Sequence, residues 1–127
     1  ALDMFETVKF ACLLQKAVRR DPTTLTARQA LEMATIGGAR VLGIDDEVGS
    51  LTPGKKADFI MVDLRVPSTV PLHDIHAALV YSARSGAVKA VFVEGEPVVL
   101  GGRPTRLDPT EILEKAEDLA HELVSGA

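Results

Sequence analysis

The stretch GSLTPGKKADFIMVD, residues 49–63, decides how this chain can fold, because a turn-forming segment leads directly into a short apolar run. Residues 59–62 read FIMV and are bounded by aspartates on both sides. A continuous apolar run of this length is typical of a strand covered on both faces. The Pro53-Gly54 pair favours a tight turn just before it. The stretch therefore predicts a turn followed by a buried strand.

Residues 49–56 also come close to the phosphate-loop pattern GxxxxGK[ST]. Lys56 stands where that pattern needs a hydroxyl to hold magnesium. A phosphate loop also opens a helix whose N-terminus binds the phosphate, whereas this segment runs into a strand. We therefore interpret the segment as a structural turn and not as a nucleotide site.

Residues 88–93 and 98–100 predict a β-hairpin downstream. VKAVFV is rich in β-branched and aromatic residues, and Glu94-Gly95 supplies a turn because glycine allows a positive φ. Pro97 lacks a backbone N–H and so favours an edge position for the return strand. Gly101-Gly102 is expected to close a sheet of only two or three strands, which is thin for an independent core.

Two helices are predicted before the strands. The first begins at the N-cap Asp3, with Glu6 in the capping-box position, and ends before Asp21-Pro22. The second begins at Thr26 and is expected to end at Gly37-Gly38. One further helical turn is expected over residues 39–43.

A third helix is predicted from Asp108, with Pro109 at its first position and Glu111 completing a capping box. The helix is amphipathic, and most of its acidic residues lie opposite the apolar stripe, as expected for a solvated outer face. The stripe consists of Ile112, Leu113, Ala116, Leu119, Ala120, Leu123 and Val124.

Helices at both ends with strands between them indicate an α+β fold rather than alternating βαβ units. We expect helices over residues 1–45, strands over 46–107 and the amphipathic C-terminal helix over 108–127.

Composition excludes several classes of protein. With 127 residues, 46% hydrophobic and 25% charged, the chain matches an ordinary globular protein. A net charge of −4 argues against nucleic acid as a partner, because phosphate binding needs clustered Lys and Arg.

No apolar run is long enough to span a membrane, the start of the chain has no secretory signal pattern, and a single cysteine implies no disulfide. These features predict no membrane partner and a cytoplasmic protein. Position 1 is not Met, which suggests processing or a longer parent.

Candidate chemical groups are few. His73 and His76 flank Asp74 with a spacing of three, as on one helical face, but zinc needs at least three protein ligands and none is near in sequence. Cys12 lies on an apolar helix face, where a buried inert thiol is expected. The acidic loop 45–47 lacks the ligand pattern of a calcium loop. No serine stands in a GxSxG context; the serines considered are Ser50, Ser68, Ser82 and Ser85. The sequence thus predicts no catalytic, cofactor-binding or metal-binding residue in this chain.

Four segments, residues 26–43, 48–63, 79–82 and 88–99, occur in the order found near the C-terminus of the amidohydrolase superfamily. The chain resembles most closely the aminohydrolase branch, which contains methylthioadenosine/S-adenosylhomocysteine deaminases, guanine and cytosine deaminases and triazine chlorohydrolases. The resemblance extends over nearly the whole chain.

The resemblance implies a parent with a (β/α)8 barrel and a small composite β-sandwich. This chain would be an α+β fragment supplying the last barrel helix, sandwich strands and a C-terminal helix. In the family, a zinc or iron ion held by histidines and an aspartate activates the attacking water, and a glutamate carries protons. None of these residues has a counterpart here, and the metal aspartate would fall just upstream of Ala1.

Only scaffold roles carry over from the family. Gly54 would turn into the sandwich, and Asp58 would accept hydrogen bonds from backbone N–H groups of that turn. Glu94-Gly95 stands where the family commonly has Asp-Gly.

Two hypotheses follow. In the first, the chain is the C-terminal segment of a metal-dependent enzyme that hydrolyses C–N bonds, deaminating a purine or nucleoside-like heterocycle, and is inactive alone. In the second, it is a stand-alone structural or oligomerisation module whose apolar faces are buried against another copy. The expected partners are accordingly the rest of the parent barrel or a second copy, with a small heterocyclic substrate for the parent.

Overall fold

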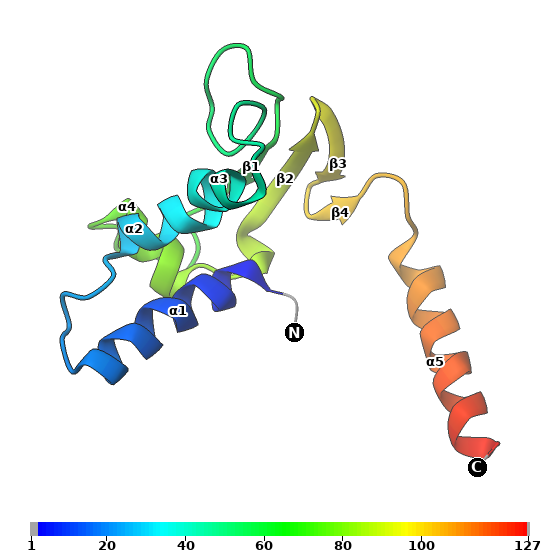
Figure 1. Ribbon diagram of the computed structural model, residues 1–127. Helices are drawn as coiled ribbons and strands as arrows, with labels where there is room; N and C mark the ends of the chain where they lie inside the picture. Colours follow the sequence, from blue (N-terminus) through cyan, green and yellow to red (C-terminus); the bar gives the residue numbers. More distant parts are fainter. Residues whose placement is uncertain (1–2, 127) are drawn as a thin grey trace.

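The computed structural model describes residues 3–126, and helices flank a small antiparallel sheet (Figure 1). Ala1, Leu2 and Ala127, at the ends of the predicted first and third segments, lie outside the described residues. The elements in chain order are α1 (Met4–Arg19), α2 (Ala27–Glu32), η1 (Met33–Gly37), α3 (Gly38–Leu42), β1 (Phe59–Val62), α4 (Ile75–Ala77), η2 (Ala78–Ser82), η3 (Ser85–Ala87), β2 (Val88–Val93), β3 (Glu96–Leu100), β4 (Arg103–Pro104) and α5 (Pro109–Ser125).

The predicted N-caps Asp3, Thr26 and Asp108 are confirmed, but the capping box predicted for Asp108 and Glu111 is wrong, because the Asp108 carboxylate accepts its hydrogen bond from the Thr110 N–H at 2.9 Å. The Asp3 carboxylate accepts hydrogen bonds from the backbone N–H groups of Phe5 (2.9 Å) and Glu6 (3.4 Å). At α2, Thr26 and Gln29 form a complete capping box, with side chains and backbone N–H groups bonded in both directions. Each cap satisfies backbone donors that the first helical turn leaves unpaired.

The expected break at Gly37-Gly38 is wrong. Both glycines have helical dihedrals, with φ of −64° and −61°. The chain continues through the π-helical segment η1 into α3. Gly43, with φ of 70° in the left-handed region, ends the helix instead. A glycine inside a helix only weakens it, by about 1 kcal/mol relative to alanine, so two adjacent glycines do not by themselves end one.

A second difference lies between β1 and β2, where the sequence indicated no helix. Residues 75–82 form α4 and the π-helical segment η2 there. Asp74 caps α4 by accepting a hydrogen bond from the Ala77 N–H at 2.6 Å. Val80 of this segment is buried in one cluster with Cys12 of α1 and Ala30 of α2, a contact distant in sequence that stabilises the segment.

The sheet has four antiparallel strands in the order β1-β2-β3-β4, one more than the upper expectation. Phe59 pairs with Phe92, and their rings stack at a centroid distance of 4.6 Å. Glu94 and Gly95 both have positive φ, 52° and 82°, as a tight hairpin turn requires. The expected edge position of β3 holds only at Pro97: the two-residue strand β4 pairs with Val99 and Leu100 at the other end of β3 and is the outer strand there.

The core is small and lies among the helices. Cys12 of α1, Ala30 of α2 and Val80 of η2 form its buried centre. Five partly buried residues pack around it: Val8, Leu25, Ala27, Leu31 and Tyr81. The predicted burial of the Cys12 thiol is confirmed, with no exposed surface.

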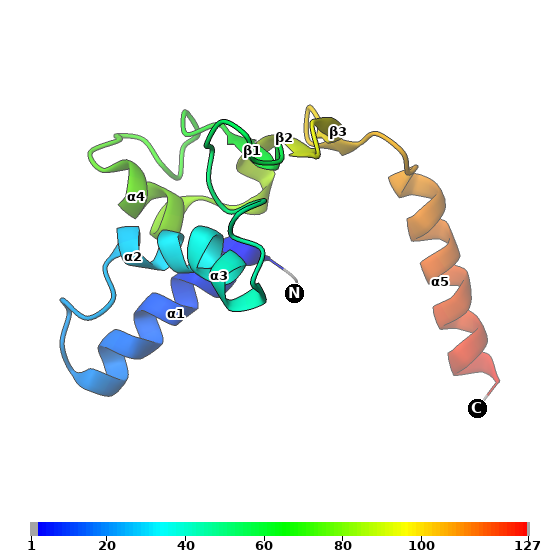
Figure 2. The same cartoon turned by 45° about the horizontal axis from the view of Figure 1, so that its top comes forward.

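Helix α5 stands apart from the rest of the described chain. Figure 1 and its turned view, Figure 2, both show α5 on the far side of an open space from α1. All of its described residues are exposed. The predicted helix is confirmed, and its apolar stripe contacts no other element of residues 3–126 closely.

Candidate functional site

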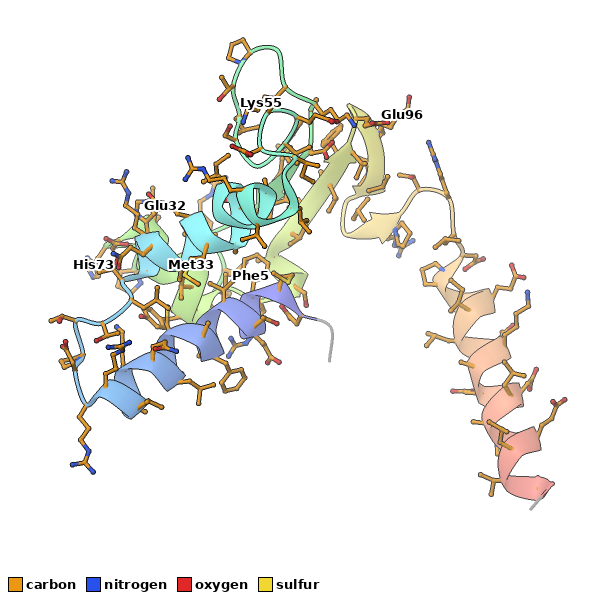
Figure 3. The ribbon with its side chains drawn as sticks, in the orientation of Figure 1. Phe5, Glu32, Met33, Lys55, His73 and Glu96 are labelled. Atoms are coloured by element: carbon orange, nitrogen blue, oxygen red, sulfur yellow. The ribbon has the colours of Figure 1, made fainter. Side chains whose placement is uncertain are left out.

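The two lysines of the phosphate-loop look-alike make contacts inside the protein. The ammonium group of Lys55 donates hydrogen bonds to the backbone carbonyls of Asp45 and Val48, and the Lys56 backbone N–H donates to the Glu47 carbonyl at 2.8 Å. These bonds fold the 44–56 loop back on itself (Figure 3, Lys55). A lysine bonded to carbonyls inside its own loop is not presented to a phosphate, which supports the structural interpretation of this turn.

Lys56 joins this loop to the hairpin. Its Nζ lies 2.7 Å from a Glu47 carboxylate oxygen and 3.1 Å from one of Glu94. Hydrogen bonds from Lys56 to these carboxylates, first Glu47 and then Glu94, raise the pKa of the Lys56 ammonium above its ordinary value. The group is therefore a permanent cation between two acids.

Asp58 does not bond the Gly54 turn as the resemblance implied. Its carboxylate instead accepts a hydrogen bond from the Glu94 backbone N–H, 36 residues later, at 2.6 Å. The Gly95 N–H donates to the Ala57 carbonyl at 3.1 Å beside it. We call the set Glu47, Lys56, Asp58 and Glu94 the hairpin latch. It positions the turn of the β2–β3 hairpin against the start of β1.

The two histidines do not form a site. His73 precedes α4 and His76 lies within it, so they do not share one helical face, and both are exposed (Figure 3, His73). Asp74, between them, caps the helix. Across residues 3–126 no group of three or more His, Cys, Asp and Glu side chains is placed to hold a metal ion. The residues present therefore do not fit the zinc or iron that the resemblance implies.

One buried polar group was not indicated by the sequence. The Tyr81 hydroxyl is buried and has no hydrogen-bond partner among the described residues. The Nζ of Lys16 lies over the Tyr81 ring, 5.4 Å from its centre, and the interaction with Tyr81 raises the pKa of Lys16. The apolar residues around Tyr81 in the sequence do not reveal whether its hydroxyl group will find a hydrogen-bond partner.

The main surface feature is that α1 is apolar on two opposite faces. One face carries the buried Cys12, whereas the other carries Phe10, Leu13, Leu14 and Val18, with exposed fractions from 43% for Leu13 to 78% for Val18. A helix of this kind is normally covered on both sides. Helical spacing could have revealed the second face, because Phe10 and Leu13 do not fall on the stripe that contains Cys12.

A groove of about 1040 Å³ lies between α1 and the α2–η1 helix. Leu14, Met33 and Ile36 provide its apolar lining, and Figure 3 shows Met33 between these helices. The sheet has a related feature: Ile60 and Met61, which point to opposite faces of β1, are both more than half exposed. The strand over residues 59–62 is thus confirmed, but the described chain does not cover both of its faces.

No helix in the described part of the chain combines the length and the apolar character needed to cross a bilayer.

Comparison with known families gives the class. The model of the Amidohydrolase family matches residues 1–98 of the 127, and this chain therefore belongs to that family.

Particular relatives narrow the comparison to deaminases. The chain is 44% identical to the 5-methylthioadenosine/S-adenosylhomocysteine deaminase of Moorella thermoacetica over 94% of its own length and 28% of that protein. It is also 44% identical to the 5′-deoxyadenosine deaminase of Methanosarcina acetivorans, over 99% of the chain and 29% of that protein. The chain thus spans less than a third of the length of these curated relatives.

Two solved enzyme structures resemble this chain in fold. An adenosine deaminase from Xanthomonas campestris with bound zinc superposes with a TM-score of 0.92 at 35% identity, covering 96% of this chain and 28% of that one. The atrazine chlorohydrolase of Arthrobacter aurescens, complexed with zinc, has a TM-score of 0.79 at 30% identity, covering 91% and 26%. Both neighbours are zinc proteins, whereas the described residues of this chain hold no metal-ligand cluster.

Proposed function

We propose that this chain is the C-terminal part of a metal-dependent amidohydrolase that deaminates an adenosine-like substrate. In such a reaction water replaces the amino group of the heterocycle and ammonia is released. The observation that carries the proposal is the 44% identity to deaminases over nearly the whole chain, combined with coverage of only 28–29% of their length.

In this proposal α1 is the last helix of the barrel, the β1–β4 sheet belongs to the composite sandwich, and α5 is the C-terminal helix. The second apolar face of α1 and the doubly apolar strand β1 support it, because both are built to be covered on two sides. A barrel active site is assembled from the ends of several strands. We assign no catalytic step to this chain, since its residues do not fit the metal, and we place the zinc or iron site in the polypeptide outside it.

A direct test replaces the aligned 120 residues of the Moorella thermoacetica deaminase with this chain. We expect the resulting chimera to fold and to release ammonia from 5-methylthioadenosine, the substrate in the name of the Moorella enzyme, because the exchanged part supplies scaffold and not catalytic groups. The matched control is the same enzyme with these residues deleted. A chimera that is no more active than the deletion variant would contradict the proposal.

The chain alone provides a second measurement. We expect the purified 127-residue chain to bind neither zinc nor iron stoichiometrically and to show no deaminase turnover. Stoichiometric metal with turnover would overturn our placement of the active site. The alternative function, an oligomerisation module without catalysis, is favoured only by the exposed apolar faces, and it predicts a stable dimer of the chain and an inactive chimera.

A further inference from the structure

Helix α5 carries a single apolar stripe with no partner in the described chain. Leu119, Leu123 and Val124 of this stripe are 60%, 78% and 80% exposed. The opposite side of the helix is charged and suited to water. The apolar stripe is therefore the face of α5 that a partner would cover.

The segment just before α5 is tied to strand β3 of the sheet. The Thr105 N–H donates to the Val98 carbonyl at 3.0 Å, and the Thr105 hydroxyl donates to the Pro97 carbonyl at 2.7 Å. Arg106 forms an ion pair with Glu96 at 3.2 Å. Only residues 107–108 separate these anchors from the helix. From these anchors α5 leads away from the sheet, as Figures 1 and 2 show.

The same placement occurs in a solved relative. Because α5 makes up 17 of the 127 residues, a match covering 96% of the chain must include most of this helix. That match has a TM-score of 0.92 to the Xanthomonas campestris adenosine deaminase, of which the chain covers only 28%. More than two thirds of that enzyme therefore lies outside the matched part and is available to fill the space beside α5.

We propose that α5 is a clasp, whose apolar stripe docks on an apolar surface of the polypeptide that precedes this chain in its parent. This inference rests on the proposed function. It adds that α5, which lies beyond the residues 1–98 matched by the family model, fastens the sheet to the rest of the enzyme.

The test uses the chimera with the Moorella thermoacetica deaminase. Leu119→Glu and Leu123→Glu place charges on the stripe, and Asp118→Lys is the control on the opposite face. We expect the stripe variants to speed proteolytic cleavage within residues 101–108 about tenfold or more, because an undocked α5 opens this segment more often. The control should be cleaved at the rate of the parent chimera. If either glutamate variant fails to fold, Leu119→Ala and Leu123→Ala should show a smaller increase in the same direction.

The other outcomes overturn the inference in distinguishable ways. Unchanged cleavage in an active chimera means that α5 is not docked, although the proposed function stands. A chimera that sediments as a dimer and becomes monomeric with Leu119→Glu shows that a second copy covers the stripe. A chimera without activity overturns the proposed function itself, and with it the assigned partner.

Discussion

Gly49 shows most clearly how one residue of the 49–63 stretch fixes the local structure. Its φ of +88° lies in the left-handed region, and a Cβ there would lie 2.8 Å from the Ala39 Cβ and 3.0 Å from the Ile36 Cα. A side chain would therefore meet both backbone strain and a steric clash with the η1–α3 helix. We expect Gly49→Ala to lower the free energy of unfolding by about 2–4 kcal/mol, measured by urea denaturation.

Gly54 is the matched control, because it has a similar φ of +94° but no other atom lies within 4 Å of the place that a Cβ would occupy. Gly54→Ala should introduce the backbone strain alone, about 1 kcal/mol. Equal losses for the two variants would show that the close approach of Gly49 to the helix does not contribute. The comparison thus separates packing from backbone conformation within one loop.

At the scale of elements, the hairpin latch connects two segments that are distant in the sequence. Its expected contribution is local, because Lys56 is partly exposed and such ion pairs are weak and screened by salt. We expect Lys56→Met to speed amide hydrogen exchange at Glu94 and Gly95 a few-fold at low salt, and less at high salt. The effect should persist from neutral into alkaline pH, since the pKa of Lys56 is raised above its ordinary value and the ammonium stays charged there.

Lys115→Met is the control for the latch, since Lys115 forms a comparable ion pair with Glu111 within α5. It should leave exchange at the hairpin unchanged. If Lys56→Met also leaves the two amides unchanged, the hairpin turn is held by the Asp58 and Ala57 backbone contacts alone.

Elements with strong local signals were predictable from the sequence. Thr26 and Gln29 define the start of α2 through their own side chains, and the positive φ of Gly95 follows from the turn chemistry. The positive φ of Glu94 does not, because residues other than glycine seldom adopt it. The continuation through Gly37-Gly38 and the helix at residues 75–82 were not predictable in this way, because contacts distant in sequence stabilise them. The partner of Asp58 was missed for the same reason, since the Glu94 N–H is brought to it only by the sheet register.

For the candidate site, the sequence predicts no catalytic or metal-binding residue, and this stays a prediction. The pattern at residues 49–56 lacks the hydroxyl and the helix of a phosphate loop, and the contacts of Lys55 support its interpretation as a structural turn. Residue patterns do not reveal which surfaces need a partner, because a stripe such as that of α5 has the same sequence signature whether it is covered or exposed.

At the scale of the whole molecule, the described chain buries little of its apolar surface. Val80 and Cys12 are the largest fully buried side chains, and most of the other buried apolar residues are alanines. A core of this size contributes little hydrophobic stabilisation, which scales with the apolar area removed from water. The groove lined by Leu14 and Met33 is one apolar surface that assembly into a larger protein would bury.

Leu14 makes this argument testable, because one substitution can be measured in two contexts. It is 60% exposed in the chain alone, so Leu14→Ala should change the free energy of unfolding there by less than about 0.5 kcal/mol. In the chimera, where we expect the groove to be filled, the same change should remove buried methyl groups and destabilise by about 2–4 kcal/mol. Val80→Ala, at a site that is 1% exposed, should destabilise both proteins and so shows that each unfolding measurement responds to core loss. Equal, small effects of Leu14→Ala in both proteins would mean that the groove stays open in the larger enzyme, and that α1 is not covered on its second face.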